Sequence, residues 1–408
     1  MSTKVIIIGG GAAGFFCAVN AAKQNPYLKI TILEKHAKKI KKVKVSGGGR
    51  CNVTHHCKHI SELVKCYPRG KNFLKKAFSL FSANDTIKWF EERGVQLKTE
   101  SDGRVFPSSN QSQTIIDCLL EEASRYNVHL QLQTEVISID KVGQQYHIHC
   151  KNKSTLFADK VFIGCGGFPK LEQYTMFESL GLQIITPVPS LFTCNTPNSG
   201  LKKLMGLVVE NASLQVASES LAERGSVLCT HWGLSGPAVL KLSSFGARLF
   251  HEKGYKATLH INFISKPESA LRNEWAAIRT KQSTNTMGNK NPFELPNRLW
   301  DYILEINGIA KELKWSELPS KEQNKLMHTL TSHEVEMHGK TTFKEEFVTC
   351  GGISVNEVNP LTMEAYRHPG LFFGGEILDI DGITGGYNFQ HAWTSAYIAA
   401  KQIARAEM

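Results

Sequence analysis

The chain opens with an apolar run followed by spaced glycines, a pattern that is typical of a βαβ unit. Residues 5–8 are Val-Ile-Ile-Ile, and the glycines that follow are Gly9, Gly11 and Gly14. The run predicts a strand buried on both faces. The glycines predict a tight turn into a helix over 12–23, whose first N–H groups can hold a pyrophosphate. Glu34 follows a second apolar run, where a carboxylate accepts hydrogen bonds from ribose hydroxyls and repels a 2′-phosphate. The order predicts a βαβ unit for FAD or NAD rather than NADP.

Composition places this unit in a globular protein with more than one core. The chain has 408 residues, so two or three domains are predicted. Mean hydropathy is −0.22, and no apolar run reaches about eighteen residues, so no membrane span is predicted. The N-terminus lacks the pattern of a secretory signal, and the ten cysteines are dispersed without a CxxC pair. These features favour reduced thiols and a cytoplasmic location.

Net charge is +11, and part of it is local. A group of basic residues follows Glu34 beside the predicted pyrophosphate site: Lys35, Lys38, Lys39, Lys41, Lys42, Lys44 and Arg50. Some of these residues could offset cofactor phosphates, and the run as a whole is interpreted as a solvated loop. No recognisable nucleic-acid-binding signature accompanies it.

The pattern along the chain predicts an α/β cofactor domain that is interrupted. Residues 1–189 form its first part, with a helix over 73–94, a strand over 128–140 that begins a β-meander, and a buried strand over 160–163. Residues 190–267 contain short apolar runs broken by glycine and polar residues, which predict an all-β insert. Residues 268–335 predict a helical insert, in which Ser320 and Gln323 could form a capping box. Residues 336–408 return first to the β insert and then to the cofactor domain.

Five stretches resemble one family, and they occur in the family's order. They are 45–54 (with Ser-Gly-Gly-Gly-Arg-Cys-Asn), 102–107, 230–237 (Thr-His-Trp-Gly-Leu-Ser-Gly-Pro), 349–353 and 374–393 (with Thr-Gly-Gly-Tyr-Asn). The chain resembles the BaiN-like flavoproteins, which include aminoacetone oxidases and bile-acid-pathway reductases. The resemblance implies a Rossmann-like FAD domain of the glutathione reductase type, interrupted by a β-barrel with a helical insertion. It departs from the family at Gly164-Cys-Gly-Gly167, where Ala-Thr-Gly-Gly is usual, and in the shorter, bulkier loop over 168–174.

The motifs and the resemblance together imply contacts to non-covalently bound FAD. Those in the N-terminal motif are Gly9, Gly11, Ala12, Ala13, Gly14, Glu34 and Lys35. Those after it are Gly48, Gly49, Arg50, Cys51 and Asn52, followed by Val136, Cys165 and Gly166. Those in the C-terminal motif are Gly375, Glu376, Asp379, Gly385, Gly386 and Asn388. Glu376 or Asp379 is expected to bind a ribityl hydroxyl, and the N–H groups of Gly385 and Gly386 are expected near flavin N1–C2=O.

Candidates for catalysis are fewer. Cys51 and Asn52 should lie near the isoalloxazine, and His231 could be a general acid or base or a packed structural histidine. His391 is interpreted as structural. The cluster of Cys51, His55, His56, Cys57 and His59 matches no common zinc spacing, so no metal is predicted. No second dinucleotide motif is present, so NAD(P)H would dock transiently, or the substrate itself would reduce the flavin and oxygen would reoxidise it.

The leading hypothesis is an FAD-dependent oxidoreductase that passes hydride between flavin N5 and a small organic substrate of amine, ketone or enone type. The substrate is expected between the flavin and the inserted domain. One alternative is an FAD-dependent tRNA-modifying enzyme, which would use the positive charge. Another is a flavin-binding regulatory protein without turnover. A small-molecule partner is favoured over nucleic acid, and no oligomeric state is specified.

Overall fold

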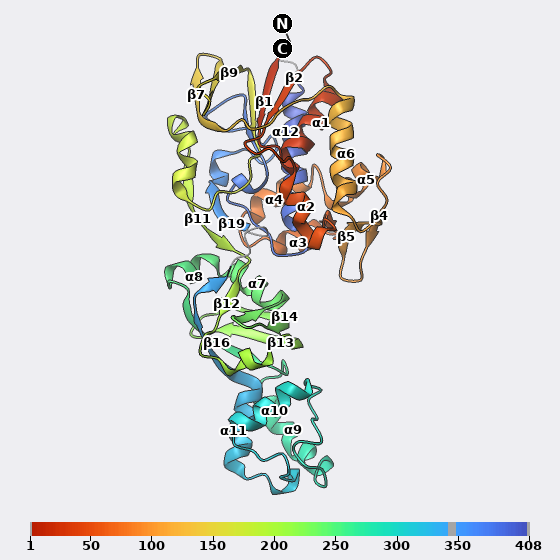
Figure 1. Ribbon diagram of the computed structural model, residues 1–408, viewed down its shortest axis with the longest axis vertical. Coiled ribbons are helices and arrows are strands. Elements are labelled where there is room, and N and C mark those ends of the chain that lie inside the picture. The colour runs from red at the N-terminus through yellow and green to blue at the C-terminus, as the bar shows by residue number, and fades with distance from the viewer. Residues whose placement is uncertain (1, 342–347, 406–408) are drawn as a thin grey trace. The chain divides into compact units, whose positions relative to one another are not determined.

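The computed structural model describes residues 2–341 and 348–405 and divides into two compact units. Unit 1 comprises Met1–Ser190 and Lys344–Met408, and unit 2 comprises Leu191–Phe343. Figure 1 shows the elements of each unit along the chain.

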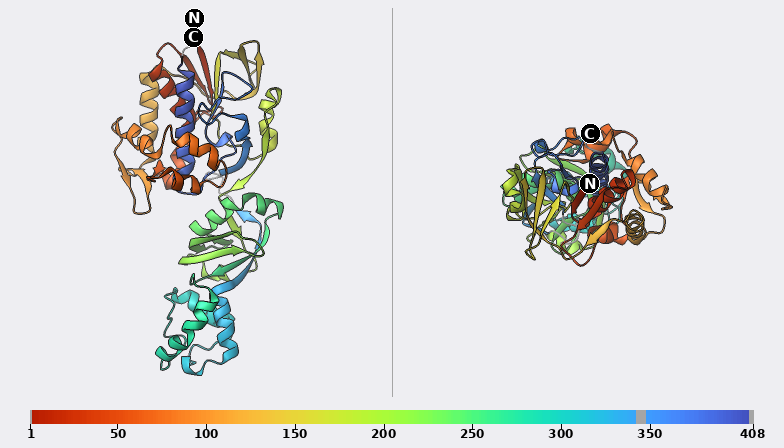
Figure 2. Two further views of the ribbon diagram at one scale, coloured as in Figure 1. Left: turned by 180° about the vertical axis from the view of Figure 1, so that it is seen from behind. Right: turned by 90° about the horizontal axis from the view of Figure 1, so that it is seen from above.

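Unit 1 is built on a five-stranded parallel sheet in the order β20-β10-β1-β2-β6. The strands are β1 (Lys4–Ile8), β2 (Lys29–Leu33), β6 (His129–Gln131), β10 (Lys160–Ile163) and β20 (Leu371–Phe373). Val5–Ile8 and the whole of β10 are buried, as expected for strands covered on both faces. Helix α1 (Ala12–Gln24) packs against α6 (Ser112–Arg125) and against the C-terminal helix α12 (Tyr387–Ile403) (Figures 1 and 2). The predicted α/β Rossmann-type fold is confirmed.

Smaller sheets and helices complete unit 1. The meander consists of β7 (Val136–Val142), β8 (Gln145–Cys150) and β9 (Thr155–Ala158), and a second sheet joins β3 (Thr54–His55), β5 (Arg104–Pro107) and β4 (Leu97–Thr99). Strand β11 (Ile184–Ser190) pairs with β19 (Val348–Ile353). Four further helices lie between β2 and β4: α2 (Lys41–Val45), α3 (Ile60–Leu63), α4 (Lys71–Phe78) and α5 (Ala83–Glu91).

Unit 2 contains an antiparallel sheet that closes on itself. Its strands are β12 (Thr193–Asn195), β13 (Val208–Val216), β14 (Ala222–Cys229), β15 (Gly233–Ser235), β16 (Lys256–Asn262), β17 (His333–His338) and β18 (Lys340–Thr341). Strands β17 and β18 are separated only by Gly339, which has a φ of +97°. Because β17 pairs with β16 and β18 pairs with β12, this bent segment joins the two ends of the sheet.

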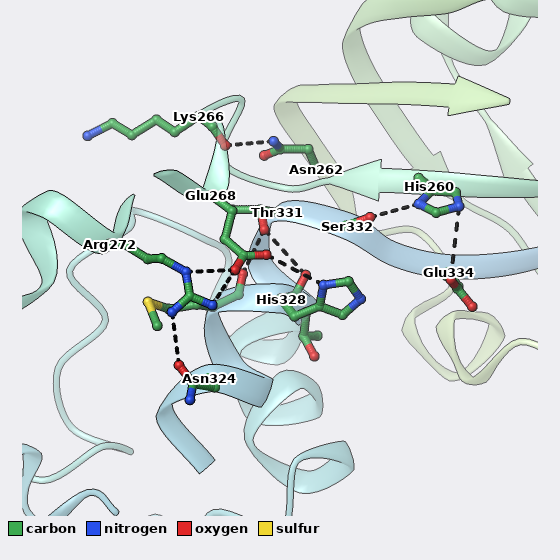
Figure 3. Close-up of polar contacts among 12 residues, drawn as sticks. His260, Asn262, Lys266, Glu268, Arg272, Asn324, His328, Thr331, Ser332 and Glu334 are labelled. Carbon is green, nitrogen blue, oxygen red and sulfur yellow. Dashed lines mark hydrogen bonds and ion pairs between the residues drawn. The ribbon is translucent and has the colours of Figure 1, made fainter. Parts of the chain in front are cut away.

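Unit 2 also contains helices, and stacked tryptophans and a polar network lie among those after residue 267. They are α7 (Pro237–Phe245), α8 (Ala247–Glu252), α9 (Glu268–Lys281), α10 (Asn297–Ile306) and α11 (Ser320–Ser332). The buried rings of Trp300 and Trp315 stack 6.1 Å apart. Arg272 donates to Glu268 on its own helix and to Asn324 on α11 (Figure 3). The subdivision of unit 2 at residue 268 stays a prediction.

Four local predictions were wrong. The single helix over 73–94 is two, because Ser82 caps α5 in a reciprocal pair with Asp85. The strand over 128–140 is divided between β6 and β7, which lie in different sheets. The segment 190–267 contains α7 and α8 as well as strands. The capping box of Ser320 and Gln323 does not form, because Pro319 is the N-cap residue and Ser320 lies inside the helix.

Candidate cofactor and catalytic site

The turn between β1 and α1 is shaped for a phosphate. A Cβ on Gly14 would lie 1.9 Å from the carbonyl oxygen of Gly9, and one on Gly9 would lie 2.5 Å from that of Gly164. These two glycines are therefore required by the fold itself. A Cβ on Gly11 would meet nothing within 4 Å, so this position is open toward the exterior at the N-terminus of α1. Ala12 and Ala13 begin that helix, and the cradle fits a dinucleotide pyrophosphate.

Glu34 is held at the edge of this cradle. Its Oε2 accepts a 2.9 Å hydrogen bond from the N–H of Gly10, and its Oε1 accepts one of 2.8 Å from the N–H of His36. Each carboxylate oxygen keeps further lone pairs. The position therefore suits a ribose hydroxyl donor, and Lys35 next to it is exposed.

The segment 47–51 has an unusual backbone. Gly47, Gly48 and Gly49 all have positive φ, and Gly48 and Gly49 are exposed with open space where a Cβ would be. Successive backbone N–H groups in such a run can bind an anion. Arg50 is already engaged, since its guanidinium bonds Glu100 at 2.7 Å and lies 4.0 Å above the ring of Phe106.

Cys51 and Asn52 are buried at the end of this run. Burial raises the pKa of the Cys51 thiol to about 12, although a hydrogen bond with Ser46 opposes the shift, so the thiol is protonated at neutral pH. The Asn52 amide fits its neighbours when Oδ1 accepts from the N–H of Gly386 at 3.1 Å and Nδ2 donates to the carbonyl of Thr54 at 2.9 Å. The N–H of Gly386, expected to face the flavin, is therefore bonded to Asn52 in this structure.

Glu376 is bonded to residues from two other parts of the chain. Its Oε2 accepts a 2.6 Å hydrogen bond from Lys42 Nζ, and its Oε1 accepts one of 2.9 Å from the N–H of Thr349. A Cβ on Gly166 would lie 3.9 Å from both Glu376 Oε2 and Lys42 Nζ. Gly166, Lys42 and Glu376 thus gather at one place in unit 1.

The other predicted FAD contacts lie in unit 1, in the following settings. Burial raises the pKa of the neighbouring Cys165 thiol to about 12. The N–H of Asp379 donates to the carbonyl of Ile353. The Asn388 side chain bonds both the N–H and the carbonyl of Gly382, which closes the turn before α12. Val136 starts β7 and pairs with Cys150, and Gly375 and Gly385 have positive φ.

The two candidate histidines differ in setting. His391 is 1% exposed, and its Nε2 lies 3.1 Å from the carbonyl oxygen of Gly375. Burial lowers its pKa to about 4, so the ring is neutral. His231 is an exposed residue of unit 2 in the turn between β14 and β15, with its ring edge-on to Trp232.

Two arrangements in unit 1 were not predicted. His55 stacks on Tyr387 with 4.9 Å between ring centroids, and its Nε2 lies 2.9 Å from the carbonyl oxygen of Asp102. The buried carboxylate of Asp381 binds Arg69 through two oxygens and accepts a 2.7 Å hydrogen bond from Ser190. No sequence signal pairs these residues, because they are brought together only by the packing of α12 and β11.

No group of three or more His, Cys, Asp or Glu side chains in residues 2–341 and 348–405 is arranged to hold a metal ion. Within the same residues, no helix combines the length and apolarity that crossing a membrane requires.

Comparisons with known proteins find relatives over nearly the whole chain. The HI0933-like protein Rossmann domain matches residues 3–402. The chain is similar to the ribosomal RNA dihydrouridine synthase of Escherichia coli, at 31% identity over 98% of each chain. It is also similar to the 3-dehydro-bile acid delta(4,6)-reductase of Clostridium scindens, at 26% identity over 98% of this chain and 99% of the relative.

The fold is shared with a solved steroid dehydrogenase. The 3-ketosteroid-delta4-(5alpha)-dehydrogenase of Rhodococcus jostii superposes with a TM-score of 0.52 at 12% identity, over 99% of this chain and 97% of that one. The family match and the curated relatives, rather than this shared fold, confirm the predictions of an FAD cofactor and of an FAD-dependent oxidoreductase at the level of the family. The chain belongs to the HI0933-like family of FAD-binding Rossmann proteins.

Proposed function

We propose that the protein reduces a carbon–carbon double bond conjugated with a carbonyl group. The observation that carries the proposal is a chemistry shared by two kinds of full-length relative. Dihydrouridine is uridine with its C5=C6 bond reduced, and that bond is conjugated with the C4 carbonyl. The double bonds of a 3-dehydro delta(4,6) bile acid are conjugated with the 3-keto group in the same way. The enone class is therefore favoured over the amine and ketone classes.

The reaction adds two electrons and two hydrogens to the substrate. Hydride is added to the β-carbon and a proton to the α-carbon, and the π bond between them is lost. FAD, when bound, supplies the hydride chemistry at N5. An external two-electron donor of the NAD(P)H class is included in the proposal to balance the reaction.

The protein's own residues would bind FAD and orient it. Gly11 and the α1 N-terminus would hold the pyrophosphate, Glu34 a ribose, and Glu376 or Asp379 the ribityl chain. Asn52 fixes the turn at Gly386 through the bond described above. Of the three predicted catalytic residues, His231 is the candidate for delivering the proton at the α-carbon, because Cys51 is fully buried with a raised pKa and the amide of Asn52 is not an acid.

Half-reactions test the proton donor. Cys51→Ala, Asn52→Ala and His231→Ala are each loaded with FAD, and reduction by NAD(P)H is timed separately from reoxidation by an enone. The variant that lacks the donor is expected to be reduced normally and to lose about 10²- to 10⁴-fold in the reoxidation rate. If all three variants are reoxidised at the rate of the unaltered protein, none of these residues delivers the proton.

A second candidate function is reduction of a uridine within RNA. It is favoured by the net charge of +11 and by the 31% identity to the Escherichia coli relative. The two candidate functions are distinguished by the oxidant that the reduced protein accepts. The oxidants compared are free uridine, a small steroid enone and ribosomal RNA. A flavin that no member of the panel reoxidises would instead favour a regulatory flavoprotein.

A further inference from the structure

The positive charge of this protein comes from one short stretch. Residues 35–76 hold thirteen of the 48 Lys and Arg residues and a single acidic residue, Glu62, of the 37 in the chain. The other 366 residues therefore carry 35 basic and 36 acidic side chains, a net charge of −1. A surface charged only for solubility would not require this segregation.

Most of these basic side chains face solvent. Eleven lysines of the stretch are exposed: Lys35, Lys38, Lys39, Lys41, Lys42, Lys44, Lys58, Lys65, Lys71, Lys75 and Lys76. Lys42 and Lys65 pair with Glu376 and Glu62. Eight others form no ion pair with any residue that the structure describes: Lys35, Lys38, Lys39, Lys41, Lys44, Lys58, Lys75 and Lys76. Their mutual repulsion is not offset by acidic neighbours, which is costly unless an anionic partner binds.

The stretch is held against the folded unit and is not a loose tail. The N–H of Ile40 donates to the carbonyl of Gly10 at 2.8 Å, and Lys42 bonds Glu376, so its first part is fixed at the cofactor site. Helix α4 buries Phe73 and Leu74 and leaves Lys75 and Lys76 outside. A large anion held here would lie against the same unit that binds the dinucleotide.

We infer that residues 35–76 form the surface through which the protein binds the phosphate backbone of a folded RNA. A dinucleotide pyrophosphate has two phosphate groups, which is too little negative charge to match this excess, whereas RNA adds one charge with every nucleotide. The inference rests on the second candidate function, in which the reduced base is a uridine of RNA. Lysines that contact phosphates position an RNA without reading its sequence.

Neutralising variants test the surface in the FAD-loaded protein. Lys38, Lys39 and Lys41 are changed to Gln together, and Lys75 and Lys76 in a second variant. The matched control changes three exposed lysines of unit 2, Lys281, Lys290 and Lys314, to Gln, which removes the same charge. The dissociation constant for Escherichia coli ribosomal RNA is measured from low to high salt, with heparin and phosphatidylserine vesicles as other polyanions.

The expected result is salt-dependent RNA binding that the first variant weakens by about tenfold or more, with the slope of log Kd against log salt reduced by about two. The second variant weakens binding in the same direction, and the unit 2 control leaves it unchanged. Equal weakening by the control, or tighter binding to heparin or vesicles than to RNA, overturns the inference. Reduction of a small enone stays unaltered in the variant at Lys75 and Lys76 and in the unit 2 control, so failure of the proposed reaction is seen separately.

Discussion

Lys42 Nζ donates a 2.6 Å hydrogen bond to Glu376 Oε2, although 334 residues separate them in the sequence. The Lys42 side chain is 56% exposed, so the pair itself stabilises the fold by at most about 1 kcal/mol. The pair matters for position, because it holds α2 next to the turn that follows β20. Segments from the two ends of the chain therefore lie next to each other in unit 1.

Alanine substitutions at two glycines of the first motif should have different effects, one on stability and the other on FAD affinity. Gly14→Ala forces a Cβ into the carbonyl of Gly9, so we expect loss of about 3 kcal/mol of unfolding free energy or no folded protein. Gly11→Ala meets nothing and has ordinary backbone angles, so the apoprotein should keep its Tm while FAD affinity falls at least about tenfold. Thermal melts and flavin titration separate the effects. A Gly11→Ala protein that binds FAD normally would contradict the assigned cradle.

Glu34→Gln should weaken FAD binding without unfolding the protein. The carboxylate accepts hydrogen bonds from Gly10 and His36, and the neutral amide supplies a weaker acceptor to these groups and to a ribose. We expect the Kd for FAD to rise about tenfold. Glu172→Gln, at an exposed acid of the same unit, is the matched control. Equal affinities of the two variants would remove Glu34 from the binding site.

Stability should fall in acid because of His391. The folded protein keeps this ring neutral with a pKa lowered to about 4, whereas the unfolded chain titrates at the usual 6.5. Protons therefore bind the unfolded chain first, so the contribution is full above pH 6.5 and is lost as pH falls toward 4, by about 3 kcal/mol. Urea unfolding across this range should show a smaller slope for His391→Gln than for unaltered protein. The exposed His129→Gln serves as control, and an unchanged slope in the His391 variant would refute the assignment.

Cys51 should be chemically inert in the folded protein. It is fully buried with its pKa raised to about 12, so little thiolate exists at neutral pH. Brief iodoacetamide treatment followed by mass spectrometry should modify the partly exposed Cys57 and leave Cys51 unmodified until urea is added. Modification of both at similar rates would mean that Cys51 is accessible and reactive.

Local rules predicted the first βαβ unit well. The buried apolar run, the spaced glycines and Glu34 shape the backbone close to them in the sequence. The sequence therefore contains most of the information needed to predict this unit. The break before α5 also has a local signal, Ser82 with Asp85, which the apolar pattern across 73–94 obscured. Helix α7 was not predicted, because the short apolar runs on both sides of it favoured an all-β segment, although Pro237 at its first turn favours a helix.

The partners of the site residues could not be predicted in this way. Arg50 bonds Glu100 because β3 and β5 pair, and Asn52 meets Gly386 because α12 packs back onto the N-terminal half. These contacts depend on tertiary register rather than on local spacing. The sequence therefore predicts which segments hold the cofactor, while the structure supplies the partner of each side chain.

Anaerobic reoxidation tests the central claim most directly. The FAD-loaded protein is reduced with one equivalent of dithionite and mixed without oxygen with a steroid 4-en-3-one or with uridine-containing ribosomal RNA, while flavin absorbance near about 450 nm is followed. Reduction of a conjugated double bond predicts return of the absorbance together with an equivalent amount of the saturated product. Absorbance that returns only when oxygen is admitted, with every conjugated acceptor recovered unchanged, would contradict it.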